Sequence, residues 1–209
     1  MAARLDPARV RANLEAVRRE VGDGVEVLAA TKYLPLDQIG ALVEAGVTLA
    51  GENRAQDLAA KAAAHPELTW DFIGQLQSRK VKQVLPHVRY IHSVASDSAL
   101  RELGKHGTTH TRVLVEVNVA QEPGKAGILP GELAAFLERG ASGPYSVVGL
   151  MTMPPYAEDP EENRRWFAAL RELAERHGLR ELSMGTTQDY AVAAQEGATI
   201  VRIGSRLYT

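Results

Sequence analysis

The stretch Ala29-Ala30-Thr31-Lys32-Tyr33-Leu34-Pro35 joins a segment typical of a buried strand to one typical of a helix. Residues 25–28 before it are mostly apolar, and after Pro35 apolar residues recur at helical spacing. Lys32 therefore lies at the C-terminal end of a βα unit, where parallel α/β proteins build their binding sites. Partial loss of hydration there would favour the neutral amine, which can form a Schiff base. The alternative is a solvated surface lysine that ends a strand.

The composition is that of an ordinary globular protein. The chain has 209 residues, 45% of them hydrophobic and 24% charged, and a formal net charge of −2. Lys and Arg are spread along the chain, so nothing favours nucleic-acid binding. The absence of cysteine excludes disulfides and thiolate chemistry. The first six residues lack the apolar core of a signal peptide and no run has the length of a membrane span, so we expect a cytoplasmic protein.

Strand-like and helix-like segments alternate along the whole chain. This alternation, without a linker or a change of composition, predicts an α/β protein with parallel strands and crossover helices in one domain, residues 1–209. About eight such units in roughly 200 residues are typical of a single (β/α)8 TIM-type barrel. The alternative is an open doubly wound sheet, which would usually carry a glycine fingerprint in place of residues 31–35. The expected strands are 25–30, 47–50, 70–74, 90–94, 112–118, 146–152, 181–185 and 198–204.

Two loops late in the chain have the residues of a phosphate site. Gly185-Thr186-Thr187 follows the seventh expected strand and Gly204-Ser205 the eighth, and barrels often bind phosphate at these two loops. The threonines are expected to start a helix whose free backbone N–H groups favour an anion, or to act as a plain N-cap. A lysine combined with a phosphate site indicates either pyridoxal 5'-phosphate (PLP) held as an internal aldimine or a class I aldolase acting on a phosphorylated sugar.

Arg202 favours PLP weakly over the aldolase alternative. It lies two residues before Gly204, so the two residues point to the same side of the expected strand. A guanidinium at this place can hydrogen-bond the pyridine nitrogen of the cofactor. Its alternative role is an ion pair inside the barrel mouth, with Glu52 as the partner.

Seven short motifs in order cover nearly the whole chain. They are Ala30-Thr31-Lys32 with Pro35, Gly51-Glu52-Asn53 with Gln56, Phe72-Ile73-Gly74 with Leu76-Gln77 and Lys80, Ile91-His92-Ser93-Val94, Gly149-Leu150-Met151-Thr152, Leu182-Ser183-Met184-Gly185 and Val201-Arg202-Ile203-Gly204-Ser205. Together they resemble the pyridoxal phosphate homeostasis proteins (the YggS/PROSC-like family). The resemblance implies one PLP-binding barrel like the N-terminal domain of alanine racemase, which is fold type III among PLP proteins.

The resemblance also implies roles for particular residues. Lys32 carries PLP as an aldimine, and Arg202 faces the pyridine nitrogen. Asn53 lies near the ring, while Met151 and Ser183 line the site.

The phosphate is expected on Thr187, Gly204 and Ser205. Where the family usually has Met-Ser after the seventh strand, this chain has Thr186-Thr187, and either hydroxyl could bind the phosphate. The chain also stops five residues after its last strand, so the last barrel helix should be short or missing, with the N-terminal helix covering the gap.

Arginine at the pyridine nitrogen bears on function. It is a permanent donor that leaves this nitrogen unprotonated, so the ring is a poorer electron sink. Alanine racemase takes a second base from an additional domain that has no counterpart here. We therefore expect a PLP-binding protein of cofactor homeostasis, with apo PLP enzymes as transient acceptors, rather than an efficient enzyme. Without that domain, a monomer is expected.

Three alternatives stay open at this point. One is a small PLP-dependent amino-acid racemase or lyase whose second base is Tyr33, His92 or Tyr190. The others are the aldolase and a protein-binding module, for which Lys32 would be dispensable. No metal site is expected, because the six histidines have neither i, i+4 pairing nor a carboxylate at ligand spacing.

Overall fold

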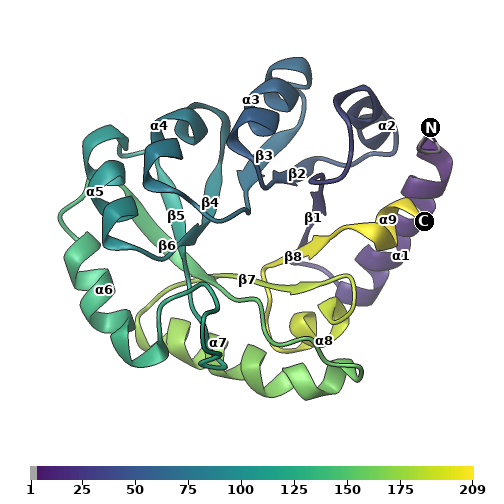
Figure 1. Ribbon diagram of the computed structural model, residues 1–209. Helices are drawn as coiled ribbons and strands as arrows, with labels where there is room; N and C mark the ends of the chain where they lie inside the picture. Colours follow the sequence, from purple (N-terminus) through teal and green to yellow (C-terminus); the bar gives the residue numbers. More distant parts are fainter. Residues whose placement is uncertain (1–3) are drawn as a thin grey trace.

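Eight parallel strands form a closed barrel that is surrounded by helices (Figure 1). The computed structural model describes residues 4–209. β1 pairs with β2 on one side and with β8 on the other, so the predicted (β/α)8 barrel is confirmed and the open sheet is excluded. The strands are β1 (Glu26–Ala30), β2 (Leu49–Glu52), β3 (Thr69–Phe72), β4 (Tyr90–Val94), β5 (Arg112–Glu116), β6 (Ser146–Met151), β7 (Glu181–Thr186) and β8 (Ile200–Ile203).

Short 3-10 turns precede or extend several of the helices. Among residues 4–209, no helix combines the length and apolar character needed to cross a bilayer. Residues 1–3, which belong to the segment expected to lack a signal peptide, lie outside the described part. The α-helices are α1 (Pro7–Val21), α2 (Ile39–Glu44), α3 (Ala55–Ala64), α4 (Val81–Val84), α5 (Asp97–His106), α6 (Leu133–Gly140), α7 (Arg164–Arg176), α8 (Tyr190–Gln195) and α9 (Ser205–Tyr208). The 3-10 helices are η1 (Leu36–Gln38), η2 (Ser78–Lys80), η3 (Leu85–His87), η4 (Pro130–Glu132) and η5 (Pro160–Asn163).

Local capping explains where two helices begin. Asp6 caps α1 by accepting a hydrogen bond from the backbone N–H of Ala8 at 3.0 Å, as the Asp-Pro sequence predicts. Ser96 caps α5, because its hydroxyl accepts a hydrogen bond from the backbone N–H of Ala99 at 3.2 Å.

The N-terminal helix lies beside the short C-terminal one, purple beside yellow in Figure 1. α1 packs against α9, α8 and α2, so it covers the barrel where α9 is too short to do so. Asn13 on α1 donates to the backbone carbonyls of Leu207 and Thr209, both at 3.1 Å. The expected short last helix and its cover by the first helix are confirmed.

Apolar side chains form two cores. The larger one lies between the strands and the surrounding helices. The smaller one fills the lower barrel interior and consists of Leu28, Leu49, Tyr90, Leu114, Met151 and Ile200. Side chains alternate between these two faces along each strand, so the residue two positions beyond an inner-core residue also points inward. The polar residues above the small core therefore converge at the C-terminal mouth of the barrel.

Candidate functional site

A cavity of about 730 Å³ opens at the C-terminal ends of the strands. It is bounded by the loops after β1, β2, β7 and β8 and by inward-facing residues of β5, β6 and β8. Eight of the nine sequence-predicted site residues line it: Lys32, Asn53, Met151, Thr186, Thr187, Arg202, Gly204 and Ser205. The ninth, Ser183, lies fully buried beneath and touches the cavity only through Arg202.

Lys32 enters this cavity from the loop after β1. Its side chain is exposed, and its Nζ lies 4.9 Å from the centre of the Tyr33 ring. The partial desolvation expected from the sequence is therefore not observed, because the barrel mouth is open on this side. The amine is free to react with a ligand, and the neighbouring aromatic face gives it a weak electrostatic partner.

The loop after β7 differs from the prediction. Thr186 ends the strand and α8 begins only at Tyr190, with Asp189 at its N-cap position, so the threonines do not start the helix. Asp189 accepts from the backbone N–H of Thr186 at 2.7 Å and from its hydroxyl at 3.2 Å. The Thr187 hydroxyl instead accepts from the backbone N–H of Gly204 at 3.2 Å. Thr187 is thus the threonine that joins the two phosphate-type loops.

Gly185 is needed for this loop to pass close to α8. Its φ of +87° lies in the left-handed region, and a Cβ there would come within 2.5 Å of the Cβ of Ala193. Gly204 is different, because a Cβ on it would meet only the Cβ of Ala30, at 4.0 Å. The packing of the described residues does not require a glycine at 204, so the free space beside it is available to a ligand.

Arg202 is held rigidly on the barrel axis. It is buried, and its guanidinium donates to the Ser183 hydroxyl at 2.6 Å and to the Thr152 carbonyl at 2.9 Å, with Met153 Sδ also at 2.9 Å. Burial lowers the pKa of Arg202 to about 10, against the opposing effect of the Asp189 and Glu116 carboxylates, so it stays charged at neutral pH. The alternative ion pair with Glu52 is wrong, because Glu52 faces the helices and Arg202 the interior.

A buried chain of hydrogen bonds supports Arg202 from below. Because the guanidinium can only donate, the single proton of Ser183 goes to Nδ1 of His92, 2.8 Å away. His92 then carries its own proton on Nε2 and donates it to Asp71 Oδ2 at 3.0 Å. Arg89 completes the chain with a 2.8 Å bond to the same oxygen.

The charge states of this chain follow from burial and pairing. Burial lowers the pKa of His92, although the hydrogen bond to Asp71 works against this effect, so the ring is neutral. Burial acts to raise the pKa of Asp71, but the hydrogen bond from His92 and the charge of Arg89 outweigh it and hold the pKa below its usual value. The Asp-His-Ser order resembles a hydrolytic triad. Ser183 is fully buried and bonded to Arg202, however, so its hydroxyl orients the arginine and does not act as a nucleophile.

A second buried pair fixes the loops after β1 and β2. Lys61 on α3 lies 2.5 Å from Glu52 Oε2, with side-chain exposures of 5% and 0%. Lys61 also donates to the Thr31 carbonyl at 2.9 Å, directly before Lys32. Glu52 accepts from the Thr31 hydroxyl at 2.9 Å and from the backbone N–H of Asn53 at 2.7 Å. This ion pair therefore positions both Lys32 and Asn53.

Two acceptors on the cavity wall have no donor. Asn53 Oδ1 is buried without a hydrogen-bond partner in the described structure. Glu116 ends β5 and is only 8% exposed, and among residues 4–209 nothing donates a hydrogen bond to its carboxylate, which faces the cavity. A buried acceptor without a donor is costly, so a ligand that donates to Asn53 is expected, and the Glu116 carboxylate favours a donor or a cation in the cavity.

Two of the three second-base candidates are occupied elsewhere. His92 is held in the buried chain, and the Tyr190 hydroxyl donates to Glu20 on α1. Tyr33 lines the cavity beside Lys32. No group of three or more His, Asp or Glu side chains among the described residues is arranged to hold a metal ion.

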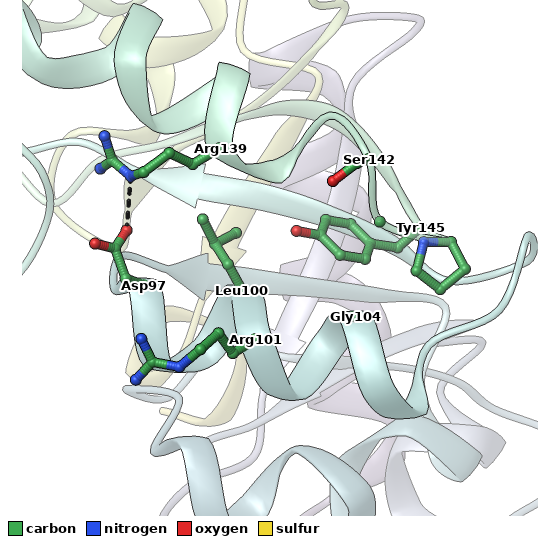
Figure 2. Close-up of a pocket in the computed structure, with 9 residues that line it drawn as sticks. Asp97, Leu100, Arg101, Gly104, Arg139, Ser142 and Tyr145 are labelled. Atoms are coloured by element: carbon green, nitrogen blue, oxygen red, sulfur yellow. Dashed lines mark hydrogen bonds and ion pairs between the residues drawn. The ribbon is translucent and has the colours of Figure 1, made fainter.

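A further cavity lies on the outer face of the barrel between α5 and α6 (Figure 2). It has a volume of about 490 Å³, and Arg139 crosses its edge to bind Asp97 at 2.9 Å. Tyr145 lies along its wall and precedes the first residue of β6, whereas Lys32 follows the last residue of β1. Arg139 and Asp97 pair with each other and no lysine of the described residues lines this cavity, so it does not compete with the barrel mouth as the candidate site.

The fold and the site together define the class of protein. The family model "Alanine racemase, N-terminal domain" matches residues 5–209. Lysine/ornithine decarboxylase of Vibrio vulnificus has the same fold, with a TM-score of 0.75 over 97% of this chain and 62% of that chain, at 13% identity. The chain is thus a barrel of the alanine racemase N-terminal type, with a lysine at the end of β1.

More similar proteins identify the family within this class. The pyridoxal phosphate homeostasis protein of Aquifex aeolicus is 38% identical over 216 residues, which cover 96% of this chain and 95% of that protein. The structures of PipY of Synechococcus elongatus, solved with and without PLP, give TM-scores of 0.83 and 0.84 at 31% identity, covering 96% of this chain and all of theirs. The chain belongs to the pyridoxal phosphate homeostasis protein family.

Sequence reasoning missed four residues of the site region: Asp71, Glu116, Lys61 and Tyr208. The Tyr208 hydroxyl donates to the Ala30 carbonyl at 3.0 Å and lines the cavity. Asp71 and Glu116 could have been found as single charges inside strands of otherwise apolar character. Lys61 lies on a helix among alanines, where its burial depends on packing that the sequence does not display.

Proposed function

We propose that the barrel mouth binds PLP, that the amine of Lys32 holds the cofactor covalently, and that the protein carries PLP for cofactor homeostasis. The observation that supports this is the meeting of three groups in one cavity: a free lysine amine, a buried guanidinium, and the loop pair joined by Thr187 and Gly204. When bound, the cofactor supplies an aldehyde that a primary amine can capture.

The residues of the cavity fit this cofactor. The space beside Gly204, which a Cβ would fill, lets an anion approach the backbone between the two loops. The hydroxyls of Thr187 and Ser205 lie at the same place and can donate to phosphate oxygens. Arg202 remains cationic at neutral pH and can only donate, which suits the lone pair of a pyridine nitrogen.

The test begins with the visible spectrum of the protein loaded with PLP. A band that bleaches on borohydride reduction, followed by a pyridoxyl mass on the peptide containing Lys32, is expected. The Lys32→Ala variant should give no labelled peptide. The control Lys105→Ala removes an exposed lysine on α5 and should be labelled at Lys32 like the wild type. A protein that stays colourless with added PLP, or labelling spread over other lysines, would contradict the proposal.

The position of Tyr33 favours one second candidate, the amino-acid racemase or lyase. Its ring lies beside Lys32 and lines the cavity, so the Tyr33 side chain could act as a base on the carbon of a bound substrate. This function predicts solvent-deuterium exchange at the α-carbon of alanine or serine, lost in Tyr33→Phe. The carrier function predicts at most slow exchange, unchanged by this substitution.

A further inference from the structure

Glu116 is the one acidic side chain that lines the barrel mouth in the part of the chain described. It ends β5, which lies opposite β1 in the closed ring of eight strands, so it faces Lys32 across the cavity. The residue is only 8% exposed, and no described group donates a hydrogen bond to its carboxylate, whose oxygens face the open cavity. A negative charge in this position favours a cationic ligand that donates hydrogen bonds.

The neighbouring cations do not serve as that donor. Arg202 directs its N–H groups to Ser183, Thr152 and Met153, and Lys125 on the loop after β5 pairs with Glu122. Burial raises the pKa of Glu116, while the charges of Arg202 and Lys125 act in the opposite direction. Both cations influence the carboxylate at a distance, but neither satisfies its oxygens.

PLP does not satisfy them either. Its phosphate oxygens and its pyridine nitrogen are acceptors, and Arg202, Thr187 and the Gly204 loop are the donors suited to them. The phenolic hydroxyl of PLP can donate one hydrogen bond, for which the orphaned Asn53 oxygen is a suitable acceptor, so the negative charge of Glu116 stays unmatched. A primary ammonium group carries three N–H donors and a positive charge, which is the chemistry that suits a carboxylate.

We propose that Glu116 forms a subsite for the ammonium group of a primary amine that enters the mouth and removes the cofactor from Lys32. This inference rests on the proposed function and adds the class of molecule that receives the cofactor. Because Glu116 would repel a second carboxylate in the same space, amines without an α-carboxylate are favoured over α-amino acids. A simple alkylamine or an unmodified lysine side chain has this chemistry.

The transfer is a balanced exchange of one amine for another. The entering ammonium loses one proton to Glu116, its nitrogen bonds to the cofactor carbon that is attached to Lys32 Nζ, a second proton moves from this nitrogen to Nζ, and the bond from the carbon to Nζ breaks. The departing Nζ then recovers the first proton from Glu116, so the nitrogen-bound hydrogens and the total charge are the same before and after. No oxidant, reductant or metal is needed.

The test measures amine binding without turnover. Borohydride reduction fixes the cofactor on Lys32, after which ethanolamine is titrated calorimetrically into the wild type, Glu116→Gln, Glu116→Asp and the control Glu138→Gln, an exposed residue of α6. One saturable site is expected in the wild type and in the control, and binding at least about tenfold weaker in Glu116→Gln. Glu116→Asp keeps the charge and should fall between them, while ethylene glycol, which lacks the charge, should not bind.

Equal affinities of the wild type and Glu116→Gln, or binding of ethylene glycol as strong as that of ethanolamine, would overturn the subsite. The same titration on cofactor-free protein in phosphate buffer keeps the two proposals apart. If the Lys32 peptide carries no label but ethanolamine binds in a Glu116-dependent way, the covalent anchor fails and the subsite stands. If Lys32 is labelled and no Glu116-dependent binding is found, the subsite alone is wrong.

Discussion

Replacing Lys61 by methionine tests whether the buried ion pair with Glu52 positions the site. Methionine retains the apolar length of the side chain but removes the charge, so Glu52, which is 0% exposed, keeps its own charge without a counter-ion. Breaking a buried pair in this way costs about 3–5 kcal/mol. For a chain of this size that corresponds to a fall in Tm of about 6–20 °C. The Thr31 carbonyl also loses its donor, so we expect weaker PLP binding at neighbouring Lys32.

The assay is urea unfolding of four proteins at one pH: wild type, Lys61→Met, Glu52→Gln and the double variant. Because the double variant has neither buried charge, it should regain at least about half of the loss, so the coupling energy between the two substitutions should be at least about 2 kcal/mol. Lys105→Met is the matched control, since its pair with Glu102 lies at the surface and should make no measurable difference. A loss below about 1 kcal/mol for Lys61→Met, or strictly additive losses in the double variant, would refute this explanation.

Three further predictions concern the phosphate loops, the buried histidine and the cofactor. Thr187→Val should weaken PLP binding about tenfold, because it removes the hydroxyl beside the Gly204 N–H. Thr186→Val should mainly lower the free energy of unfolding, because its hydroxyl bonds to Asp189. Equal PLP affinities of the two variants in equilibrium dialysis would count against this assignment. Because burial lowers the pKa of His92, the unfolded chain takes up a proton below pH ~6.5 that the folded chain refuses, so stability is lost there as pH falls, by up to about 1.4 kcal/mol per unit. The stability difference between wild type and His92→Gln should therefore narrow from pH 7 to pH 5, and a constant difference would disprove the assignment. PLP at 100 times its Kd should raise the free energy of unfolding by about 2.7 kcal/mol, which corresponds to a rise in Tm of about 5–11 °C in calorimetry. The Lys32→Ala variant should show no rise in Tm at the same PLP concentration, and a rise equal to that of the wild type would contradict the role of Lys32.

The barrel could be predicted because its main signal is local. The alternation of apolar strand segments with amphipathic helices is visible residue by residue, and it places Lys32, Thr187 and Gly204 at strand ends without knowledge of the register. Strand ends were less certain, since β5 stops at Glu116 two residues before the prediction and β2 extends two residues beyond it, through Glu52. A strand end depends on its neighbours' pairing, which a single sequence does not contain.

The buried networks could not be predicted for a different reason. His92 meets Asp71 on the neighbouring strand β3 and Ser183 on β7 inside the barrel, at sequence separations of 21 and 91 residues. The expected pair of Arg202 and Glu52 does not form because the two side chains point to opposite faces of the barrel wall, Arg202 inward and Glu52 outward. In β2, Leu49 belongs to the inner core, so Glu52 three residues later must point outward to Lys61. Once the register is known, this follows from the period of two.

The contact between the first and last helices has a consequence for synthesis of the chain on the ribosome. Asn13 bonds Leu207, 194 residues later, so the apolar face of α1 cannot reach α8 and α9 until almost the whole chain has emerged. Non-local closure of this kind slows folding. The nascent barrel must therefore stay open at the β1–β8 seam during translation, and docking of α1 with pairing of β1 to β8 should be among the last steps of folding.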